Sequence, residues 1–225
     1  ELSIEKYEGN GVVALGNGFT GAIHEVTLWD AAVDVTNLQA QMYETKMPTT
    51  ENLIGYWKFN EGRGTQAQDL ARNRHMTIKN TAWYLNNQNK ALDLANDALY
   101  ADNDAVAIYL AECPARNNDD YAVEMWFRAE KEQDEEVVYL FDTDAFGAAL
   151  EEGKMVLYAT QDDKTIMSMG NKKYNDANWH HFAMNVLRSG NAVVYIDGEA
   201  VGQGAVFLGA GVGLAAARTV ADGGL

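Results

Sequence analysis

The sequence predicts an all-β protein built as a sandwich of two antiparallel sheets, with one short helix. Many short segments alternate apolar and polar residues between turns rich in Gly, Asn and Asp, which is typical of antiparallel strands. Only one segment, at about residues 34–46, spaces its apolar residues as a helix does. An apolar content of 47%, with five Trp and eleven Tyr among 225 residues, is sufficient for a large core rich in aromatic side chains.

One meander in the last third of the chain has the clearest strand pattern. Phe182, Met184 and Val186 recur at every second residue, so they share one face of a strand. The residues Ser189-Gly190-Asn191 tolerate the positive φ of a tight reversal and predict a turn into a second strand. Asp197-Gly198 predicts a further turn into a third strand.

Two adjacent histidines, His180 and His181, open this meander. Neighbouring residues of a strand point to opposite faces, so the pair would not chelate one metal ion together. The chain also lacks the Gly-x-Ser-x-Gly turn that presents a catalytic serine to a histidine. We therefore expect one of the two histidines to pack and to form hydrogen bonds at the start of the strand.

Two strands are predicted near the start of the chain, at residues 11–15 and 22–29, separated by the turn residues Gly16-Asn17-Gly18. In the second strand, strict alternation divides the side chains between two faces. One face would hold Ile23, Glu25, Thr27 and Trp29, and the other Ala22, His24, Val26 and Leu28.

The predicted helix spans residues 34–46. Val35, Leu38, Met42 and Tyr43 are spaced by three and four residues, and Asp34 or Thr36 can cap the first turn. Pro48 would end the helix. Further strands are predicted at residues 76–79, 91–94, 105–109, 120–128, 136–141, 154–160 and 164–169.

Three segments resemble laminin G-like domains of the concanavalin A-like lectin/glucanase superfamily. Residues 179–198 contain W-H-H-x-A followed by Y-x-D-G, and residues 53–64 are similar to the opening strand L-x-x-Y-W-x-F-D-E-G-x-G. Residues 19–29, F-T-G-A-I-H-E-V-T-L-W, are similar to the closing strand F-x-G-x-I-D-E-V-R-I-W. The resemblance implies a jelly-roll sandwich.

The order of these segments implies that the chain is out of phase with its domains. Residues 1–31 would be the closing strands of a preceding copy, 32–51 a helical linker, and 52–225 a domain without its own closing strand. Residues 206–211 resemble residues 13–18, in agreement with this interpretation. Because an open sheet edge is costly, we expect residues 22–29 to complete the sandwich as a circular permutation. Strand exchange with another chain or domain is the alternative.

Composition and resemblance together limit the function. A net charge of −16 argues against nucleic acid, and no apolar run is long enough for insertion into a membrane. Such domains occur in tandem in large bacterial surface proteins, which implies a secreted or cell-surface location. The leading hypothesis is a non-catalytic module that binds a glycan or a protein in adhesion. A structural spacer is the second hypothesis. A glycoside hydrolase is third, because the E-x-D-x-x-E pattern of the glucanases is absent.

The candidate ligand-binding residues are Glu124, Trp126 and Arg128. They lie on one face of the predicted strand 120–128, where an acid, an indole and a guanidinium could stack on a sugar ring and bond to its hydroxyls. The alternative is structural: a loop covers Trp126, and Glu124 pairs with Arg128.

The resemblance also implies a structural calcium ion and no other cofactor. Related domains hold this ion between the Glu-Gly of the opening strand, here Glu61 and Gly62, and an Asp of the closing strand. His24 stands at the position of that Asp, so Asp69 or Asp93 would have to replace it.

Overall fold

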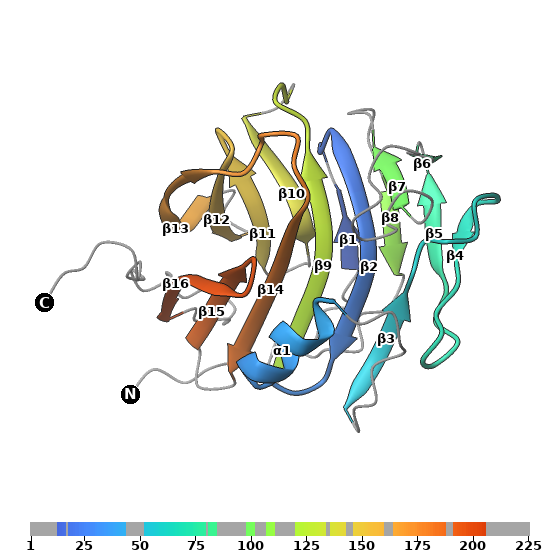
Figure 1. Ribbon diagram of the computed structural model, residues 1–225, viewed down its shortest axis with the longest axis horizontal. Helices are drawn as coiled ribbons and strands as arrows, with labels where there is room; N and C mark the ends of the chain where they lie inside the picture. The colour runs from blue at the N-terminus through green and yellow to red at the C-terminus, as the bar shows by residue number, and fades with distance from the viewer. Residues whose placement is uncertain are drawn as a thin grey trace, which may run out of the picture.

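The computed structural model describes residues 13–16, 18–43, 52–79, 81–84, 98–101, 107–110, 120–133, 136–142, 146–159, 164–187 and 191–205. These residues form two large antiparallel sheets and one helix, so the predicted fold class is confirmed (Figure 1). No helix in these ranges is long and apolar enough to cross a membrane.

Among the described residues, sheet A has eight strands, all paired antiparallel. In spatial order they are β13 (Lys164–Lys173), β12 (Lys154–Ala159), β11 (Phe146–Glu151), β10 (Val137–Asp142), β1 (Val13–Leu15), β8 (Ala107–Leu110), β5 (Met76–Lys79) and β4 (Gln66–Ala67).

Sheet B is also antiparallel throughout. In spatial order it contains β16 (Glu199–Ala205), β15 (Asn191–Ile196), β14 (His180–Leu187), β9 (Tyr121–Ala129), β2 (Gly21–Trp29), β7 (Ala98–Ala101) and β6 (Thr81–Tyr84), with β3 (Leu53–Trp57) paired to the end of β2.

The first two strands lie inside the two sheets rather than at their edges. β1 pairs with β10 and β8, and β2 pairs with β9, β7 and β3. Residues 22–29 therefore pair with later strands of the same chain, as self-completion of the sandwich requires (Figure 1). The assignment of residues 1–31, 32–51 and 52–225 to parts of two tandem copies stays a prediction.

The main core lies between the sheets. The inward face of β9 is the one predicted, with Tyr121, Val123, Met125 and Phe127 all in the core. Phe182, Met184 and Val186 of the neighbouring strand β14 lie beside them on the same face. This core removes a large apolar area from water, which is the main driving force for folding.

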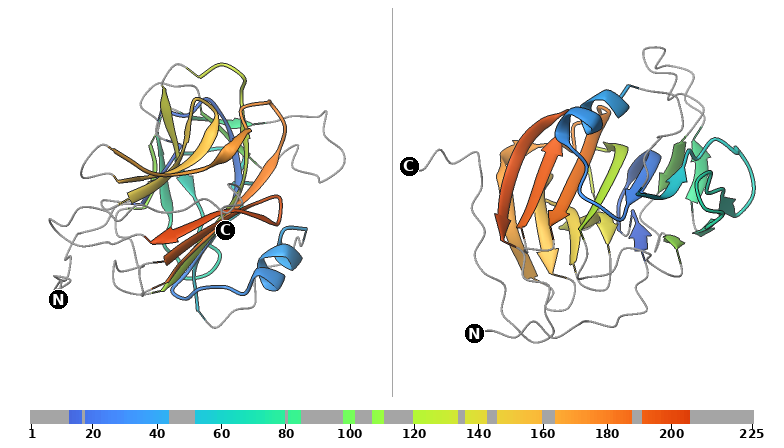
Figure 2. Two further views of the ribbon diagram at one scale, coloured as in Figure 1. Left: turned by 90° about the vertical axis from the view of Figure 1, so that its left-hand side faces the viewer. Right: turned by 90° about the horizontal axis from the view of Figure 1, so that it is seen from below.

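A second, smaller apolar cluster covers the outer face of sheet B. Helix α1 (Val35–Gln41) lies on this face, on the side away from sheet A (Figure 2, left). Leu38 is buried there, and the cluster comprises Trp29, Val33, Leu38, Leu53, Tyr56, Ala122 and Ala183.

The helix is shorter than residues 34–46. Asp34 caps it as predicted, because its carboxylate accepts a 2.8 Å hydrogen bond from the Thr36 N–H. However, the helix ends at Gln41, and Tyr43 is 66% exposed instead of packing. Apolar spacing overestimated the length because Tyr43 has no core beside it.

The strict alternation predicted for residues 22–29 was wrong. His24 pairs with Trp126 and Thr27 pairs with Glu124, so Glu25 and Val26 together oppose one residue of β9. This is a β-bulge, and Glu25 has a φ of +51° there. After the bulge the side chains change face, so Val26 and not Thr27 enters the core.

Four strands were not predicted, and they are short or poor in β-branched residues: β4, β6, β7 and β11. β11 reads Phe-Gly-Ala-Ala-Leu-Glu, and its pairing on both sides by β10 and β12 overrides its weak propensity. The strand predicted at residues 91–94 lies outside the described residues.

Candidate functional site

The β-bulge places a cluster of polar side chains on the outer face of sheet B, beside α1. We call this group the outer-face cluster. Its five residues come from four strands: His24 and Glu25 (β2), Tyr56 (β3), Glu124 (β9) and His181 (β14). Without the extra residue, His24 and Glu25 would point to opposite faces, as neighbours in a regular strand do.

Glu25 is the most accessible carboxylate of the cluster, with its side chain 19% exposed. The Tyr56 hydroxyl donates a hydrogen bond to Oε1, and Oε2 lies 3.2 Å from His24 Nε2. Burial raises the pKa of Glu25, but these two partners and the charge of Lys58 outweigh burial and hold the pKa below its ordinary value. Burial and the Glu25 charge raise the pKa of Tyr56 far above its ordinary value, so the phenol stays a donor.

Glu124 differs from Glu25 in both burial and pKa. The residue is 5% exposed, and burial raises its pKa although His181 opposes the shift; the charge of Glu25 raises it further. Its Oε2 lies 3.6 Å from His181 Nε2, which is too long for a hydrogen bond, and no other described residue supplies a hydrogen bond to that oxygen. The cluster therefore contains one carboxylate, Glu25, with a partner on each oxygen, and one, Glu124, whose Oε2 has no hydrogen-bond partner among the described residues.

The structure does not present Glu124, Trp126 and Arg128 as an open platform. Trp126 is only 8% exposed, because Met42 and Trp179 pack against it, and its ring meets His181 edge-on at 5.2 Å. A ligand would have to displace one of these neighbours to stack on the indole. Whether the row binds a ligand stays a prediction.

Arg128 has a structural role that the sequence did not indicate. Its Nε donates a 3.0 Å hydrogen bond to the Ala177 carbonyl, and its NH2 group lies 3.1 Å from a carboxylate oxygen of Glu130. It therefore ties β9 to the loop before β14 and forms an ion pair with Glu130.

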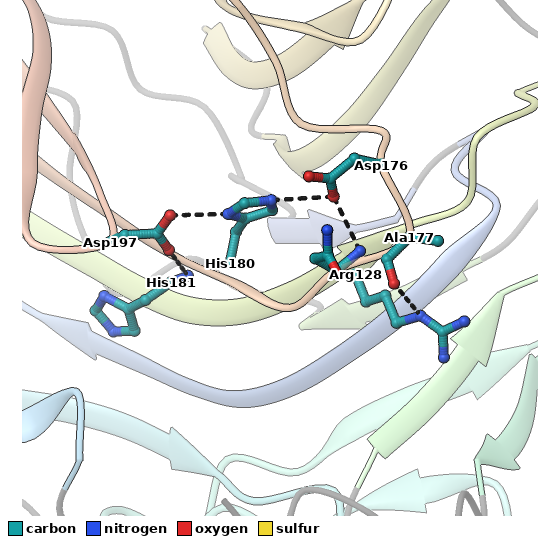
Figure 3. Close-up of polar contacts among 7 residues, drawn as sticks. Arg128, Asp176, Ala177, His180, His181 and Asp197 are labelled. Atoms are coloured by element: carbon teal, nitrogen blue, oxygen red, sulfur yellow. Dashed lines mark hydrogen bonds and ion pairs between the residues drawn. The ribbon is translucent and has the colours of Figure 1, made fainter. Parts of the chain in front are cut away.

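A second polar group, the His180 clamp, lies on the other side of sheet B and comprises Asp176, His180 and Asp197 (Figure 3). His180 Nδ1 lies 2.8 Å from Asp197 Oδ2, and Nε2 lies 3.2 Å from Asp176 Oδ1. Its ring packs against Phe127 and Tyr174. His180 thus packs and forms hydrogen bonds at the strand start, as predicted for one histidine of the pair.

The two carboxylates set the charge of the clamp. Burial lowers the pKa of His180, but Asp197 and Asp176 outweigh burial and the pKa is raised. Burial raises the pKa of Asp197, but His180 and the His181 N–H outweigh it and the pKa is lowered. The pKa of Asp176 is lowered as well, against burial, by Asn178 and His180. The group therefore favours an imidazolium between two carboxylates.

The clamp explains the spacing of the His-His and Asp-Gly motifs. Asp197 Oδ1 accepts a 3.0 Å hydrogen bond from the His181 N–H, so one carboxylate bonds to both histidines. Asp197 and Gly198 have φ values of +54° and +80°, as a two-residue hairpin turn between β15 and β16 requires. The motif therefore locks a hairpin onto the neighbouring strand.

Asp69, one of the residues predicted to bind calcium, has its carboxylate engaged by the backbone. Both oxygens of the Asp69 carboxylate accept hydrogen bonds from backbone amides, at 2.8–3.0 Å, from Tyr56, Ala71, Arg72 and Arg74. Four N–H groups around a carboxylate leave little room for a cation, because the donors are themselves electropositive. Asp69 instead fixes the loop that follows the opening strand.

Glu61 fits a cation better than Asp69 does. Its Oε1 accepts a 2.6 Å hydrogen bond from the Gln68 N–H, whereas Oε2 is buried without a hydrogen-bond partner among the described residues. Gly62 beside it has a φ of +65°. The described residues contain no group of three or more His, Cys, Asp or Glu side chains that could hold a metal ion, and Asp93 lies outside them. Calcium binding stays a prediction.

Sequence reasoning did not predict that Glu124 would share a cluster with four other polar residues: His24, Glu25, Tyr56 and His181. Their residue numbers span the chain, and only strand order brings them together. A bulge leaves a weak signal in the sequence: the apolar residues Ile23, Val26 and Leu28 are spaced by three and then two, which strict alternation does not allow.

Fold and site together define a β-sandwich module with a polar cluster on the outer face of one sheet. Comparison with protein families identifies it more closely. A laminin G-type family model, described as the concanavalin A-like lectin/glucanases superfamily, matches residues 101–220. The chain therefore belongs to the concanavalin A-like lectin/glucanases superfamily, as the resemblance of its motifs predicted. Searches of curated proteins and of solved structures found no match.

Proposed function

We propose that this chain is a non-catalytic binding module whose ligand contacts the outer face of sheet B at Glu25. The proposal is supported by two features of the outer-face cluster: backbone strain at Glu25 and a missing hydrogen bond at Glu124. Glu25 has a left-handed backbone conformation, and Glu124 is a buried carboxyl with an unpartnered oxygen. Both features cost stability, and such costs concentrate where a protein binds or reacts.

The chemistry of the cluster suits a ligand rich in hydroxyl groups. Carboxylate oxygens accept from sugar hydroxyls, while the Tyr56 phenol and the imidazoles can donate to them. Buried Trp126 lies on the same face of β9 as Glu124, half-buried Trp179 packs against Trp126, and the two indoles can supply an aromatic surface. A glycan is therefore the favoured ligand, with a surface protein as the alternative, and a secreted or cell-surface location accords with either.

A glycan array with the labelled full chain tests this proposal, followed by calorimetric titration of each glycan that binds. Glu25→Gln keeps the shape of the side chain and removes its charge. Because hydrogen bonds to charged groups are strong, we expect binding at least about tenfold weaker. Glu152→Gln is the matched control, since that side chain is 65% exposed in the turn between β11 and β12, and it should bind as the wild type does. Equal affinity of the Glu25 variant would exclude this site.

A structural spacer is the second candidate function. It is favoured by the engagement of Arg128 with Ala177 and of Trp126 with Met42, because both residues stabilise the fold without any ligand. A folded protein that binds nothing on the array or on cell surfaces would support the spacer.

Hydrolysis is the third candidate. The superfamily includes glucanases as well as lectins, and Glu25 and Glu124 have pKa shifts in opposite directions, as an acid and a nucleophile require. We favour binding without hydrolysis because the chain lacks the E-x-D-x-x-E pattern of the glucanases. Mass spectrometry of each bound glycan after long incubation distinguishes the two, since cleavage would identify a hydrolase.

A further inference from the structure

The segment of residues 31–43, which we call the strap, is held on the outer face of sheet B by a small number of contacts. Asn185 of β14 accepts a 3.0 Å hydrogen bond from the Val33 N–H and donates one of 2.7 Å to the Val33 carbonyl. Its side-chain amide thus pairs with the strap as a neighbouring strand would. Further along, Gln39 donates a 2.7 Å hydrogen bond to the Gly198 carbonyl.

The helix within the strap is too short to be stable by itself. It has seven residues, whereas isolated helices of fewer than about 12 residues are marginal in water. Leu38 is its single buried residue, and its last turn carries no basic side chain that would favour the helix dipole. The helix therefore forms because it is docked, so that docking and helix formation are one event.

The strap covers the side chains that border the outer-face cluster. Leu38 packs in the apolar cluster that contains Tyr56, which is the donor to Glu25. Met42, at the end of the strap, packs on Trp126, whose ring meets His181. This contact surface is thus linked to Glu25 through Tyr56, and to Glu124 through Trp126 and His181.

From this arrangement we propose that the strap is a lid: it undocks while the sandwich stays folded, and undocking exposes Trp126 and the cluster beside it. The buried, unpartnered Glu124 oxygen then becomes reachable, which it is not while the strap is docked. The proposal rests on the proposed binding face for its role. However, the separate opening of the strap does not depend on any ligand.

Hydrogen exchange measured by mass spectrometry on the full chain tests the separate opening. In the wild type, the amides of Leu38 and Met42 should exchange at least about a hundredfold faster than those of β9 and β14, because they open without global unfolding. Asn185→Ala removes both bonds to Val33 and should speed exchange in the strap about tenfold further. Asn171→Ala, at an exposed position of sheet A, is the control and should change nothing. Equal exchange of strap and strands, or equal acceleration of both in Asn185→Ala, would overturn the lid.

Tryptophan quenching gives a second measurement in case Asn185→Ala does not fold. Met42→Ala removes the side chain that covers Trp126 and should increase quenching of the fluorescence by acrylamide. The increase should disappear when Trp126→Phe and Trp179→Phe are both added, because Trp179 packs on the same cluster of Met42 and Trp126. An increase that persists in this triple variant, or no increase in Met42→Ala, would contradict the assignment.

The two proposals fail in different ways. If strap and strands exchange independently but no glycan binds, the lid stands and the binding function is wrong. If a glycan binds and Glu25→Gln weakens it, yet the strap opens only with global unfolding, the binding function stands and the lid is wrong.

Discussion

Replacing Glu25 by glycine and, separately, by alanine measures the backbone strain at the bulge. Both variants lose the carboxylate that accepts from the Tyr56 hydroxyl. Both should therefore be less stable than the wild type, by about 1–3 kcal/mol for a buried donor without its partner. The difference between them depends on the backbone alone, because Gly and Ala differ at this position only by a methyl group.

The magnitude follows from the φ of +51° at residue 25. A left-handed conformation costs a non-glycine residue about 1–2 kcal/mol, and glycine avoids this cost. Compared with alanine, glycine lowers the stability of the protein by about 0.4–1 kcal/mol, because the unfolded chain has more conformational entropy with glycine at this position. The net expectation is that Glu25→Gly is more stable than Glu25→Ala by about 0.8 kcal/mol, the difference between the midpoints of these ranges, or roughly 2–3 °C in Tm for a chain of this size.

Urea unfolding followed by tryptophan fluorescence gives the free energies of unfolding, provided that the denaturant slope is the same for both variants. Ala22→Gly on the same strand is the control. Ala22 lacks a positive φ, so there glycine should destabilise the protein by at least about 0.5–1 kcal/mol. If Glu25→Ala is as stable as Glu25→Gly, residue 25 is not strained, and strain no longer supports a site at the bulge.

Three further predictions concern charge. Glu124→Gln should raise the free energy of unfolding by about 1 kcal/mol at pH 7, because the raised pKa of Glu124 means that its ionised form is unfavourable in the folded state. The resulting gain in Tm should vanish as the pH falls to about 4.3, where the carboxyl of the unfolded chain also protonates. A gain in Tm that is unchanged at pH 4 would contradict this prediction. His180→Gln should lower Tm most between about pH 4 and 6.5. Because the pKa of His180 is raised, its protonation stabilises the folded state below pH 6.5, and this stabilisation is lost as the pH rises through the pKa of His180 in the folded state. In acid the stabilisation is lost as well, because Asp197, whose pKa is lowered, becomes protonated there. A decrease in Tm that is independent of pH would mean that packing alone holds the clamp. If Glu61 helps to bind calcium, EDTA should lower Tm and Glu61→Gln should abolish that effect, whereas a melting curve unchanged by the chelator would count against a bound ion.

The sequence indicated the main features of the sandwich core because the strands that form it are regular. Alternation assigned Tyr121, Val123, Met125 and Phe127 to the inner face of β9, and the structure agrees. The same reasoning failed in β2, where one additional residue moves Thr27 to the outer face. A bulge changes the face of every following side chain, and local propensity does not determine where it lies.

The candidate site was predictable only in part. Glu124 and Trp126 were found because they lie on one strand, and the covering of Trp126 was among the alternatives. Met42, which covers it, is 84 residues away in sequence (126 − 42), and its position depends on how α1 docks. The pairing of Glu25 with Tyr56 likewise depends on strand order, because β3 lies beside the end of β2.

The His180 motif shows where the division between sequence and tertiary structure lies. The sequence by itself determined the fold class, the family and the packing role of one histidine, because these follow from periodicity and from motifs of adjacent residues. Only the tertiary structure decided that Asp197 would bond to both histidines, and that a bulge would bring Glu25 beside Glu124. Such contacts join strands that are distant in sequence, so their geometry is set by sheet register and packing, which no local pattern of residues encodes.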